Sequence, residues 1–149
     1  MSPSDRIQAL LEQKSRQVWS VPSSSTVYEA IALMSERQVG ALPVVDGGKL
    51  AGMLSERDYA RKVILQGRSS KDTTVADIMT TEVITITPTQ TVEDGMHLMT
   101  DHRVRHLPVV SGGALVGIVS IGDLVNWVIS AHQEEIHHLK TYISASYPA

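Results

Sequence analysis

The sequence contains no cysteine and no phenylalanine, and aromatic residues make up only 4% of it. Without cysteine the protein can form no disulfide, no thiolate metal site and no thiol nucleophile. Without phenylalanine its core must be built from Val, Ile, Leu, Met and Ala. Few rings are left to stack on the bases of a single-stranded nucleic acid, so that class of ligand is not expected.

An excess of charge of one sign and a long apolar run are also missing. The formal net charge of the 149 residues is -3, with 19% charged residues, so no basic surface for nucleic acid is predicted. No apolar run approaches the roughly 18 residues that span a bilayer. The first fifteen residues include Asp5, Arg6 and Glu12, which excludes a signal-peptide core. We therefore expect a cytoplasmic protein with no membrane partner.

The chain contains an internal repeat. When the sequence is shifted by 65 residues, residues 26–58 align with residues 91–123 without a gap, and 15 of the 33 positions are identical. The shared positions include a Leu-Pro-Val-Val segment, a Gly-Gly pair and a Ser-x-x-Asp motif. A repeat of this length predicts two copies of one supersecondary unit.

Each copy predicts the same order of elements. Thr26 and Thr91 can cap a helix, and the Leu-Pro-Val-Val segment that follows is typical of a buried strand. The Gly-Gly pair predicts a hairpin turn into a second strand. A second helix starts after the Ser-x-x-Asp motif; in copy one it is expected to end near Gly67, and in copy two to continue far into the C-terminal tail. A short extended piece precedes each copy, at residues 17–21 and 83–87.

One such copy has too small a sheet to cover both of its helices, so the two copies are expected to pack together. The predicted fold is α/β (α+β), with two β-α-β-β-α repeats related by approximate two-fold symmetry. The predicted boundaries are residues 7–67 and 75–130, followed by a helical tail at 131–149.

The duplicated pattern of strand, Gly-Gly turn, strand and Ser-x-x-Asp resembles the CBS (cystathionine-β-synthase) domain family over roughly residues 7–130. The resemblance implies a stand-alone Bateman module, which is a regulatory, signal-transducing pair of CBS domains. It also implies an effector, not a catalytic cofactor: AMP, ATP, NADH or another adenosyl ligand, bound in the cleft between the two copies.

The Ser-x-x-Asp motifs, Ser55 to Asp58 and Ser120 to Asp123, are the first candidate ligand site. An aspartate can accept two hydrogen bonds from a ribose diol, and the N–H groups at a helix N-terminus can bind phosphate. The resemblance assigns the Ser to phosphate and the Asp to ribose. The same spacing is also that of a capping box, which would be useful in any protein.

Basic residues are distributed unequally between the copies. Arg103, Arg105 and His106 precede the buried strand of copy two, whereas Gly40 and Ala41 stand at the positions of Arg105 and His106 in copy one. The resemblance makes Arg105 and His106 phosphate ligands. The alternative is a solvated helix terminus, where basic residues favour the dipole. Arg57 has no basic counterpart in copy two and is a further candidate.

The resemblance places the adenine base against the extended segments. Trp19 has Thr85 as its counterpart and could either close the first slot or stack on a ligand. The alternative for the apolar residues of these segments, Val18, Val83 and Ile84, is that they belong to the core. The complete set of predicted nucleotide-binding residues is Lys14, Gln17, Val18, Ser55, Arg57, Asp58, Thr80, Val83, Ile84, Arg103, Val104, Arg105, His106, Ser120, Ile121, Gly122 and Asp123.

No nucleophile-elbow, P-loop or zinc-protease motif is present, so we expect no enzyme and no metal site. His132, His137 and His138 lie at spacings that are wrong for a metal pair on one helix face. Two hypotheses remain: a nucleotide sensor that acts on an unidentified protein, and a structural dimerisation module without ligand. Apolar helix faces predict a homodimer; they comprise Ile31, Met34, Met96, Met99 and the tail from Val125 to Ile143.

Overall fold

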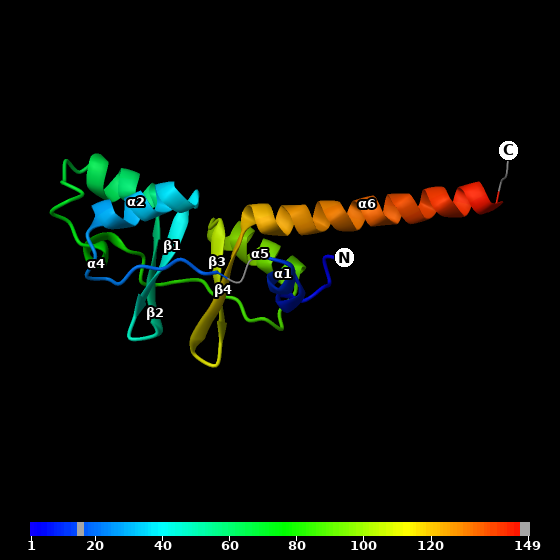
Figure 1. Ribbon diagram of the computed structural model, residues 1–149, viewed down its shortest axis with the longest axis horizontal. Helices are drawn as coiled ribbons and strands as arrows, with labels where there is room; N and C mark the ends of the chain where they lie inside the picture. The colour runs from blue at the N-terminus through cyan, green and yellow to red at the C-terminus, as the bar shows by residue number, and fades with distance from the viewer. Residues whose placement is uncertain (15–16, 147–149) are drawn as a thin grey trace. The chain divides into compact units, whose positions relative to one another are not determined.

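The structure is a computed structural model that describes residues 1–14 and 17–146 (Figure 1). Along the chain, two pairs of strands lie between groups of helices, and the strands form two two-stranded sheets, β1 with β2 and β3 with β4, which confirms the predicted mixed fold. In chain order the elements are α1 (Ile7–Gln13), α2 (Val27–Arg37), β1 (Ala41–Asp46), β2 (Lys49–Ser55), α3 (Glu56–Tyr59), the π-helix η1 (Ala60–Ile64), α4 (Val75–Ile78), α5 (Val92–His102), β3 (His106–Ser111), β4 (Ala114–Ser120) and α6 (Ile121–Ser146).

The chain folds into two compact units, and neither is a continuous half of the sequence. The first, here called the α6 unit, consists of Met1–Arg16, Ile86–Val109 and Ile118–Ala149. The second, the α2 unit, consists of Gln17–Thr85 and Val110–Gly117. Helix α1 precedes the first repeat in the sequence but belongs to the α6 unit, together with the helices of the second repeat.

Backbone hydrogen bonds join each short helix, α1 or α4, to a long helix of the other repeat. In the α6 unit, Ile7 N–H at the start of α1 donates to the carbonyl of Gln90, just before α5 (2.8 Å). In the α2 unit, Val27 N–H at the start of α2 donates to the carbonyl of Thr73, just before α4 (2.8 Å). The start of each long helix is therefore joined to a short helix that lies outside its own repeat in the sequence.

The predicted helix starts at Thr26 and Thr91 are confirmed. The Thr26 hydroxyl accepts a hydrogen bond from Glu29 N–H (3.1 Å), and the Thr91 hydroxyl accepts one from Asp94 N–H (3.0 Å). Each satisfies an N–H group that the helix itself cannot pair.

The Gly-Gly pairs form the predicted hairpin turns. In β1–β2 the turn residues Gly47 and Gly48 have φ angles of 55° and 78°, and their counterparts in β3–β4 have 58° and 82°. Two successive residues with positive φ favour glycine and match the twist of a two-residue hairpin. The extended pieces add one parallel bridge each, Val21 to Val44 and Ile86 to Val109.

The helix after the first hairpin is not regular. It is α-helical only over α3, continues as the π-helix η1, and gives way to Gly67 with a φ of 67°. The predicted end near Gly67 is confirmed, but the π turn has no signal in the sequence. In copy two α6 runs for 26 residues, as predicted. Among the described residues, no helix is long and apolar enough to cross a membrane.

Two methionines that we predicted to lie on exposed dimer faces are core residues. Met34 is 2% exposed and Met99 is 3% exposed. On α2 the buried positions are Val27, Ala30 and Met34, a spacing of three and four residues that turns one face to the sheet of its own unit. Helical spacing alone does not tell a core face from an interface, which is why this part of the prediction was wrong.

Candidate functional site

Both Ser-x-x-Asp motifs form capping boxes where a strand runs into a helix. In the α2 unit, Asp58 N–H donates to the Ser55 hydroxyl (3.1 Å), and Ser55 N–H donates to Asp58 Oδ2 (3.1 Å). In the α6 unit, Asp123 N–H donates to the Ser120 hydroxyl (3.1 Å), and Ser120 N–H donates to Asp123 Oδ2 (2.9 Å). The capping interpretation is therefore correct in both copies. The same bonds hold each carboxylate in one orientation at the start of a helix.

In the α2 unit, Asp58 is surrounded by donors. Lys62 Nζ lies 3.1 Å from Asp58 Oδ1 and also donates to the carbonyl of Ile78 (2.9 Å). The Thr80 hydroxyl lies 3.5 Å from the same Oδ1 atom. The side chain of Asp58 is 15% exposed. The structure thus brings together three predicted residues, Ser55, Asp58 and Thr80, and adds Lys62 to them.

Thr80 reaches this place because its backbone pairs with strand β2. Met53 and Thr80 exchange two N–H to carbonyl hydrogen bonds of 2.9 Å. A Cβ atom at Gly52 would lie 2.7 Å from the Thr80 carbonyl oxygen, which is closer than such atoms approach. Glycine at position 52 therefore permits the close approach of the segment that carries Thr80.

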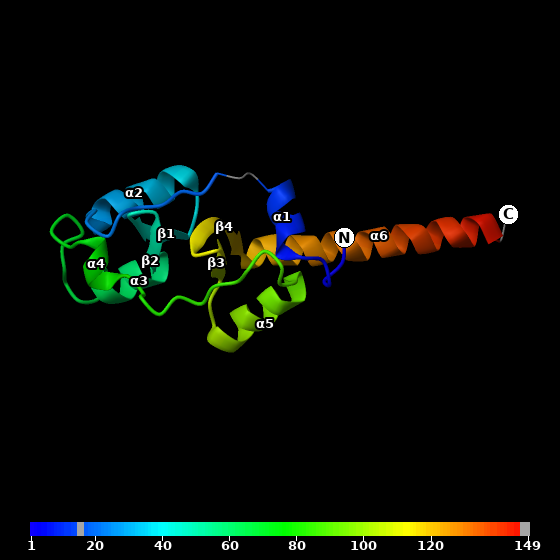
Figure 2. The same cartoon turned by 90° about the horizontal axis from the view of Figure 1, so that it is seen from below.

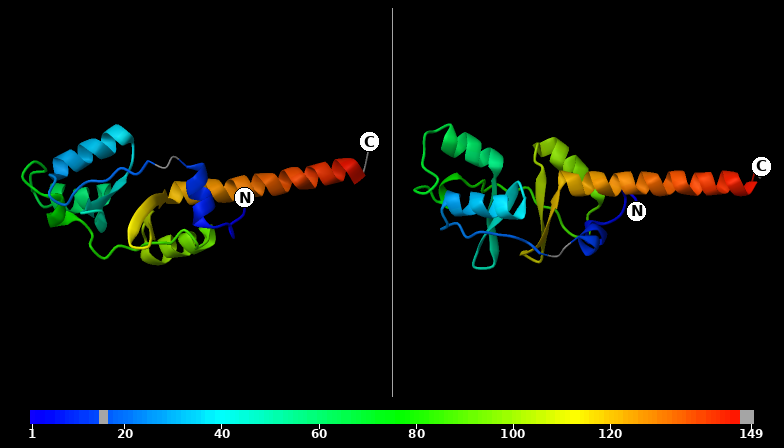
Figure 3. Two further views of the ribbon diagram at one scale, coloured as in Figure 1. Left: turned by 60° about the horizontal axis from the view of Figure 1, so that its bottom comes forward. Right: turned by 45° about the horizontal axis from the view of Figure 1, so that its top comes forward.

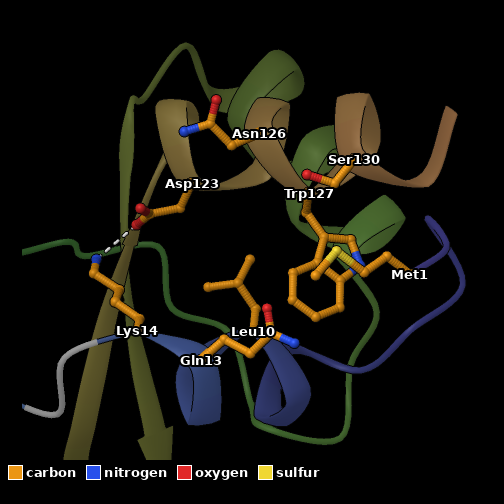
Figure 4. Close-up of a pocket in the computed structure, with 8 residues that line it drawn as sticks. All are labelled: Met1, Leu10, Gln13, Lys14, Asp123, Asn126, Trp127 and Ser130. Atoms are coloured by element: carbon orange, nitrogen blue, oxygen red, sulfur yellow. Dashed lines mark hydrogen bonds and ion pairs between the residues drawn. The ribbon is translucent and has the colours of Figure 1, made fainter. Parts of the chain in front are cut away.

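In the α6 unit, Asp123 has a different cationic partner. Lys14 Nζ lies 2.6 Å from Asp123 Oδ2 and donates to the carbonyl of Ile118 (2.8 Å). Lys14 directly follows α1, the helix that packs in this unit although it precedes the first repeat in the sequence. Figure 4 shows the ion pair as a dashed line between the end of α1 and the start of α6.

A pocket of about 240 Å³ lies beside this ion pair within the α6 unit (Figure 4). Leu10 and Trp127 supply apolar surface, and Trp127 Nε1 donates to the carbonyl of Ser2 (3.0 Å). Small-molecule sites usually measure about 300–1,000 Å³, so a whole nucleotide would extend beyond this pocket. The lining residues are Met1, Leu10, Gln13, Lys14, Asp123, Asn126, Trp127 and Ser130.

The basic segment of copy two is joined to the same place through its backbone. Ile121 N–H, at the start of α6, donates to the carbonyl of Arg105 (2.8 Å). Arg103 ends α5 in the left-handed conformation, with a φ of 54°, and Arg103 and Arg105 are both exposed. His106 begins β3 and is half-buried. In the α2 unit the equivalent bond runs from Glu56 N–H to the carbonyl of Gly40 (3.0 Å). Glycine therefore occupies the position that Arg105 has in the α6 unit.

The predicted nucleotide-binding residues are distributed over both units. In the α2 unit, Gln17 and Arg57 are exposed, and Val18, Val83 and Ile84 are half-buried. Within the described part of the chain, no hydrogen bond or ion pair joins Arg57, Val83 or Ile84 to Asp58. The α6 unit holds Lys14, Arg103, Val104, Arg105, His106, Ser120, Ile121, Gly122 and Asp123, and the α2 unit holds Gln17, Val18, Ser55, Arg57, Asp58, Thr80, Val83 and Ile84.

Two features of the site were missed or left open by sequence reasoning. Lys62 was missed, although its position four residues after Asp58 on a helix is the spacing of an ion pair. For Trp19 the structure supplies a partner, because the Arg37 guanidinium lies 3.8 Å from the centre of its ring. Trp19 also packs against the core of the α2 unit, so one face of the ring is occupied by an arginine.

Comparison with known proteins identifies the repeat. The family model of the CBS domain matches the chain twice, at residues 14–64 and 75–130. The chain belongs to the CBS-domain family. Paired CBS domains are regulatory modules, and the resemblance read from the duplicated hairpins is confirmed.

Individual CBS proteins agree with this assignment. The chain is 50% identical over 130 residues to the CBS domain-containing protein CBSX3, mitochondrial, of Arabidopsis thaliana. That alignment covers 84% of this chain but only 63% of the relative, so the chain spans less than two thirds of its length. A solved protein with CBS domains from Burkholderia ambifaria MC40-6 is 50% identical, with a TM-score of 0.82 over 85% of this chain and 95% of that one.

A third CBS structure contains ligands. The CBS domain pair of protein MJ0100 was solved in complex with 5′-methylthioadenosine and S-adenosyl-L-methionine. It is 26% identical to this chain, with a TM-score of 0.77 over 87% of this chain and 99% of that one. Both of its ligands carry an adenosine moiety.

Proposed function

We propose that this CBS-domain pair is a regulatory module that binds a phosphate-bearing adenosyl ligand, such as AMP, ATP or NADH, and passes the binding event to another protein. The observation that carries the proposal is the arrangement at Asp123. Its carboxylate is oriented by the Ser120 cap, Lys14 Nζ lies 2.6 Å away, and the backbone of Arg105 is bonded to the same helix start.

Each part of this arrangement suits one part of a nucleotide. A fixed carboxylate can accept hydrogen bonds from the two hydroxyls of a ribose. Arg103 and Arg105 carry exposed guanidinium groups, and the backbone of Arg105 is bonded to the start of α6. Such groups form strong charge-assisted bonds with phosphate. Leu10 and Trp127 offer apolar surface next to Asp123. In MJ0100 a CBS pair of related fold accommodates an adenosine moiety, which supports this ligand class.

Electrostatics favour phosphate over a sulfonium ligand in this chain. Lys14, Arg103 and Arg105 all belong to the α6 unit that contains Asp123. S-adenosylmethionine would bring a further positive charge to this group, whereas AMP would bring negative charge. We therefore propose that AMP binds more tightly than S-adenosylmethionine or adenosine. The cytoplasm, predicted from the sequence, stays a prediction, since the Arabidopsis relative is described as mitochondrial.

The proposal is tested by calorimetry with AMP, ATP, NADH, adenosine and S-adenosylmethionine at two salt concentrations. Asp123→Ala is expected to weaken AMP binding roughly 10 to 150-fold, as loss of a hydrogen-bonded charge costs about 1.5–3 kcal/mol. Asp58→Ala is the matched control, because it removes the equivalent capping aspartate from the unit that has Gly40 in place of Arg105. We expect it to have the smaller effect.

Three results would contradict the proposal. Tighter binding of S-adenosylmethionine than of AMP would show that the basic residues do not meet the ligand. Loss of AMP binding in Asp58→Ala alone would assign the site to the α2 unit. An absence of heat with every ligand, together with an unchanged melting temperature, would favour the structural dimerisation module, because a ligand at 100 times its Kd stabilises a fold by about 2.7 kcal/mol.

A further inference from the structure

Helix α6 has one face that is buried in its own unit. Leu124 is fully buried, and Trp127 and Ala131 are nearly so. These residues are three and four positions apart, so they form a single stripe along the first turns of the helix. Figures 2 and 3 show α1 and α5 lying against this first part of α6.

A second apolar stripe runs along the opposite side of α6 and is exposed. It consists of Val125, Ile129, His132, Ile136 and Leu139, here called the α6 seam. The seam residues follow one another at intervals of 4, 3, 4 and 3, which is the a and d spacing of a heptad repeat. The exposed fractions of Ile129, Ile136 and Leu139 are 49%, 48% and 61%. Four apolar seam side chains with this spacing are a stripe of the kind that pairs with another helix.

The second half of α6 has little of its own unit to pack against. Every side chain from 132 to 141 is exposed, and the helix runs on past α1 and α5 (Figures 1 and 2). The amino group of Met1 donates to Glu134 (2.9 Å), which lies at a position on the side away from the seam. Histidine and threonine, which occur in this segment, are poor helix formers. A helix of this composition is marginal on its own in water, so packing against a partner would account for it.

The charges beside the seam select the partner. Glu135 and Lys140 occupy the two flanking positions g and e, and Glu135 lies 3.8 Å from the seam residue His132. In a parallel pair of heptad helices a residue at g faces the e residue five positions later in the other helix. Glu135 of one copy would then face Lys140 of the other, twice per dimer. In an antiparallel pair, g faces g and e faces e, so Glu135 of one copy cannot face Lys140 of the other.

We propose that the α6 seam is a self-association surface, through which two copies of this chain pair as a parallel, in-register coiled coil. His132 occupies a d position in that pair, where a polar side chain favours one register at the expense of stability. This inference does not depend on the proposed ligand, because no seam residue belongs to the Ser120–Asp123 site.

The first experiment measures mass by sedimentation equilibrium of the full chain. The expected mass is twice the 16.2 kDa of one chain. The double variant Ile136→Lys, Leu139→Lys is expected to dissociate to 16.2 kDa, because it places four charges in the seam of a dimer. The matched control, His138→Lys with Thr141→Lys, adds the same number of lysines at positions outside the seam and should stay dimeric. All four side chains are exposed in the single chain, so the fold is expected to persist, which far-UV circular dichroism checks.

Charge reversal tests the pairing of Glu135 with Lys140. Glu135→Lys is expected to raise the dimer Kd several-fold, and Glu135→Lys with Lys140→Glu to restore it. His132→Leu is expected to lower the Kd by about ten-fold or more, because it completes the apolar seam. A helix that merely projects into solvent would respond to none of these changes.

Cysteine cross-linking tests the orientation, and the absence of native cysteine makes it simple. His132→Cys and Leu139→Cys, made separately, should both form a disulfide between two copies under mild oxidation. An antiparallel pair can bring only one of these positions next to its own equivalent, because they lie about 10 Å apart along the helix. A monomeric wild type, an unchanged mass for the double lysine variant, or cross-linking at only one position would overturn the proposal.

Discussion

The two capping aspartates, Asp58 and Asp123, occupy the same position in the repeat but receive their positive charge in different ways. Asp58 is paired with Lys62, four residues later in the same helical segment. Asp123 is paired with Lys14, which is 109 residues away in the sequence. The two carboxylates have closely similar caps but differ in the element that supplies the cation.

Neither of these two lysines has a lysine at its counterpart position in the repeat. The counterpart of Lys62 in copy two is Trp127. Lys14 precedes copy one, and its counterpart before copy two is Met79, which lies in the α2 unit. Met79 packs against the core of the α2 unit, and Trp127 is 7% exposed in the α6 unit. Each unit thus keeps one lysine and fills the other place with an apolar side chain. Each unit therefore has an ion pair to its capping aspartate, although neither lysine position is shared between the two repeats.

The largest expected effect comes from breaking the packing that holds Thr80 next to Asp58. Gly52→Ala would place a Cβ atom 2.7 Å from a backbone oxygen, which has to move. We expect a loss of about 1–3 kcal/mol in the free energy of unfolding, measured by urea denaturation. An unchanged stability would show that β2 and the Thr80 segment can separate at no cost.

Gly95→Ala is the matched control for this substitution. Its Cβ atom would meet the end of the Leu124 side chain at 3.2 Å, and the counterpart in copy one is already Ala30. The flexible leucine can adjust, and alanine is the better helix former by about 1 kcal/mol. The net change is expected to stay within about 1 kcal/mol of zero.

The next effect sharpens the comparison of the two lysines. Lys14→Met places in the α6 unit the apolar residue found at the counterpart position 79 and should cost about 1 kcal/mol, because Lys14 both pairs with Asp123 and donates to a backbone carbonyl. Lys62→Met should cost about 0.3–0.5 kcal/mol, since Lys62 is 44% exposed and belongs to an i, i+4 pair. Denaturation of both variants at low and high salt measures the difference. A larger loss for Lys62→Met would reverse our ranking.

The smallest effect concerns a contact found in the α2 unit. The Ser23 hydroxyl (2.6 Å) and the Ser23 N–H (2.9 Å) both donate to Asp46, and these bonds lower the pKa of the Asp46 carboxyl from its ordinary value of 3.8. The counterparts in copy two are Pro88 and Ser111, which cannot form this carboxylate contact. A lowered pKa contributes stability above pH 3.8 that is lost as the pH falls through the folded-state pKa.

Ser23→Ala removes the stronger of these two interactions. The stability advantage of the wild type over this variant is expected to be full at neutral pH and to shrink as the pH falls below about 4, the ordinary range of an aspartate. Urea denaturation at several pH values measures it. In an Asp46→Asn background the same serine substitution should show no such pH dependence, and an advantage that grows with acidity would contradict the assignment.

Most local structure was predictable from short patterns. Thr26 and Thr91 start helices because a hydroxyl can accept from an N–H group three residues later. The Gly-Gly pairs form turns because two successive positive φ angles favour glycine. The Ser-x-x-Asp motifs were predicted to be either ligand sites or caps, and the structure shows that they are caps. Their ligand role remains a proposal.

The sequence by itself therefore determined the repeat, the CBS family, the turns and the helix caps, since each depends on neighbours within a few residues or on identity between the copies. Only the tertiary structure decided that α1 packs in the α6 unit and brings Lys14 to Asp123. It also decided that Met34 and Met99 lie in the core while Ile136 and Leu139 lie outside it. Apolar residues at helical spacing mark a buried face, but the other surface that buries it is set by contacts between segments far apart in the chain.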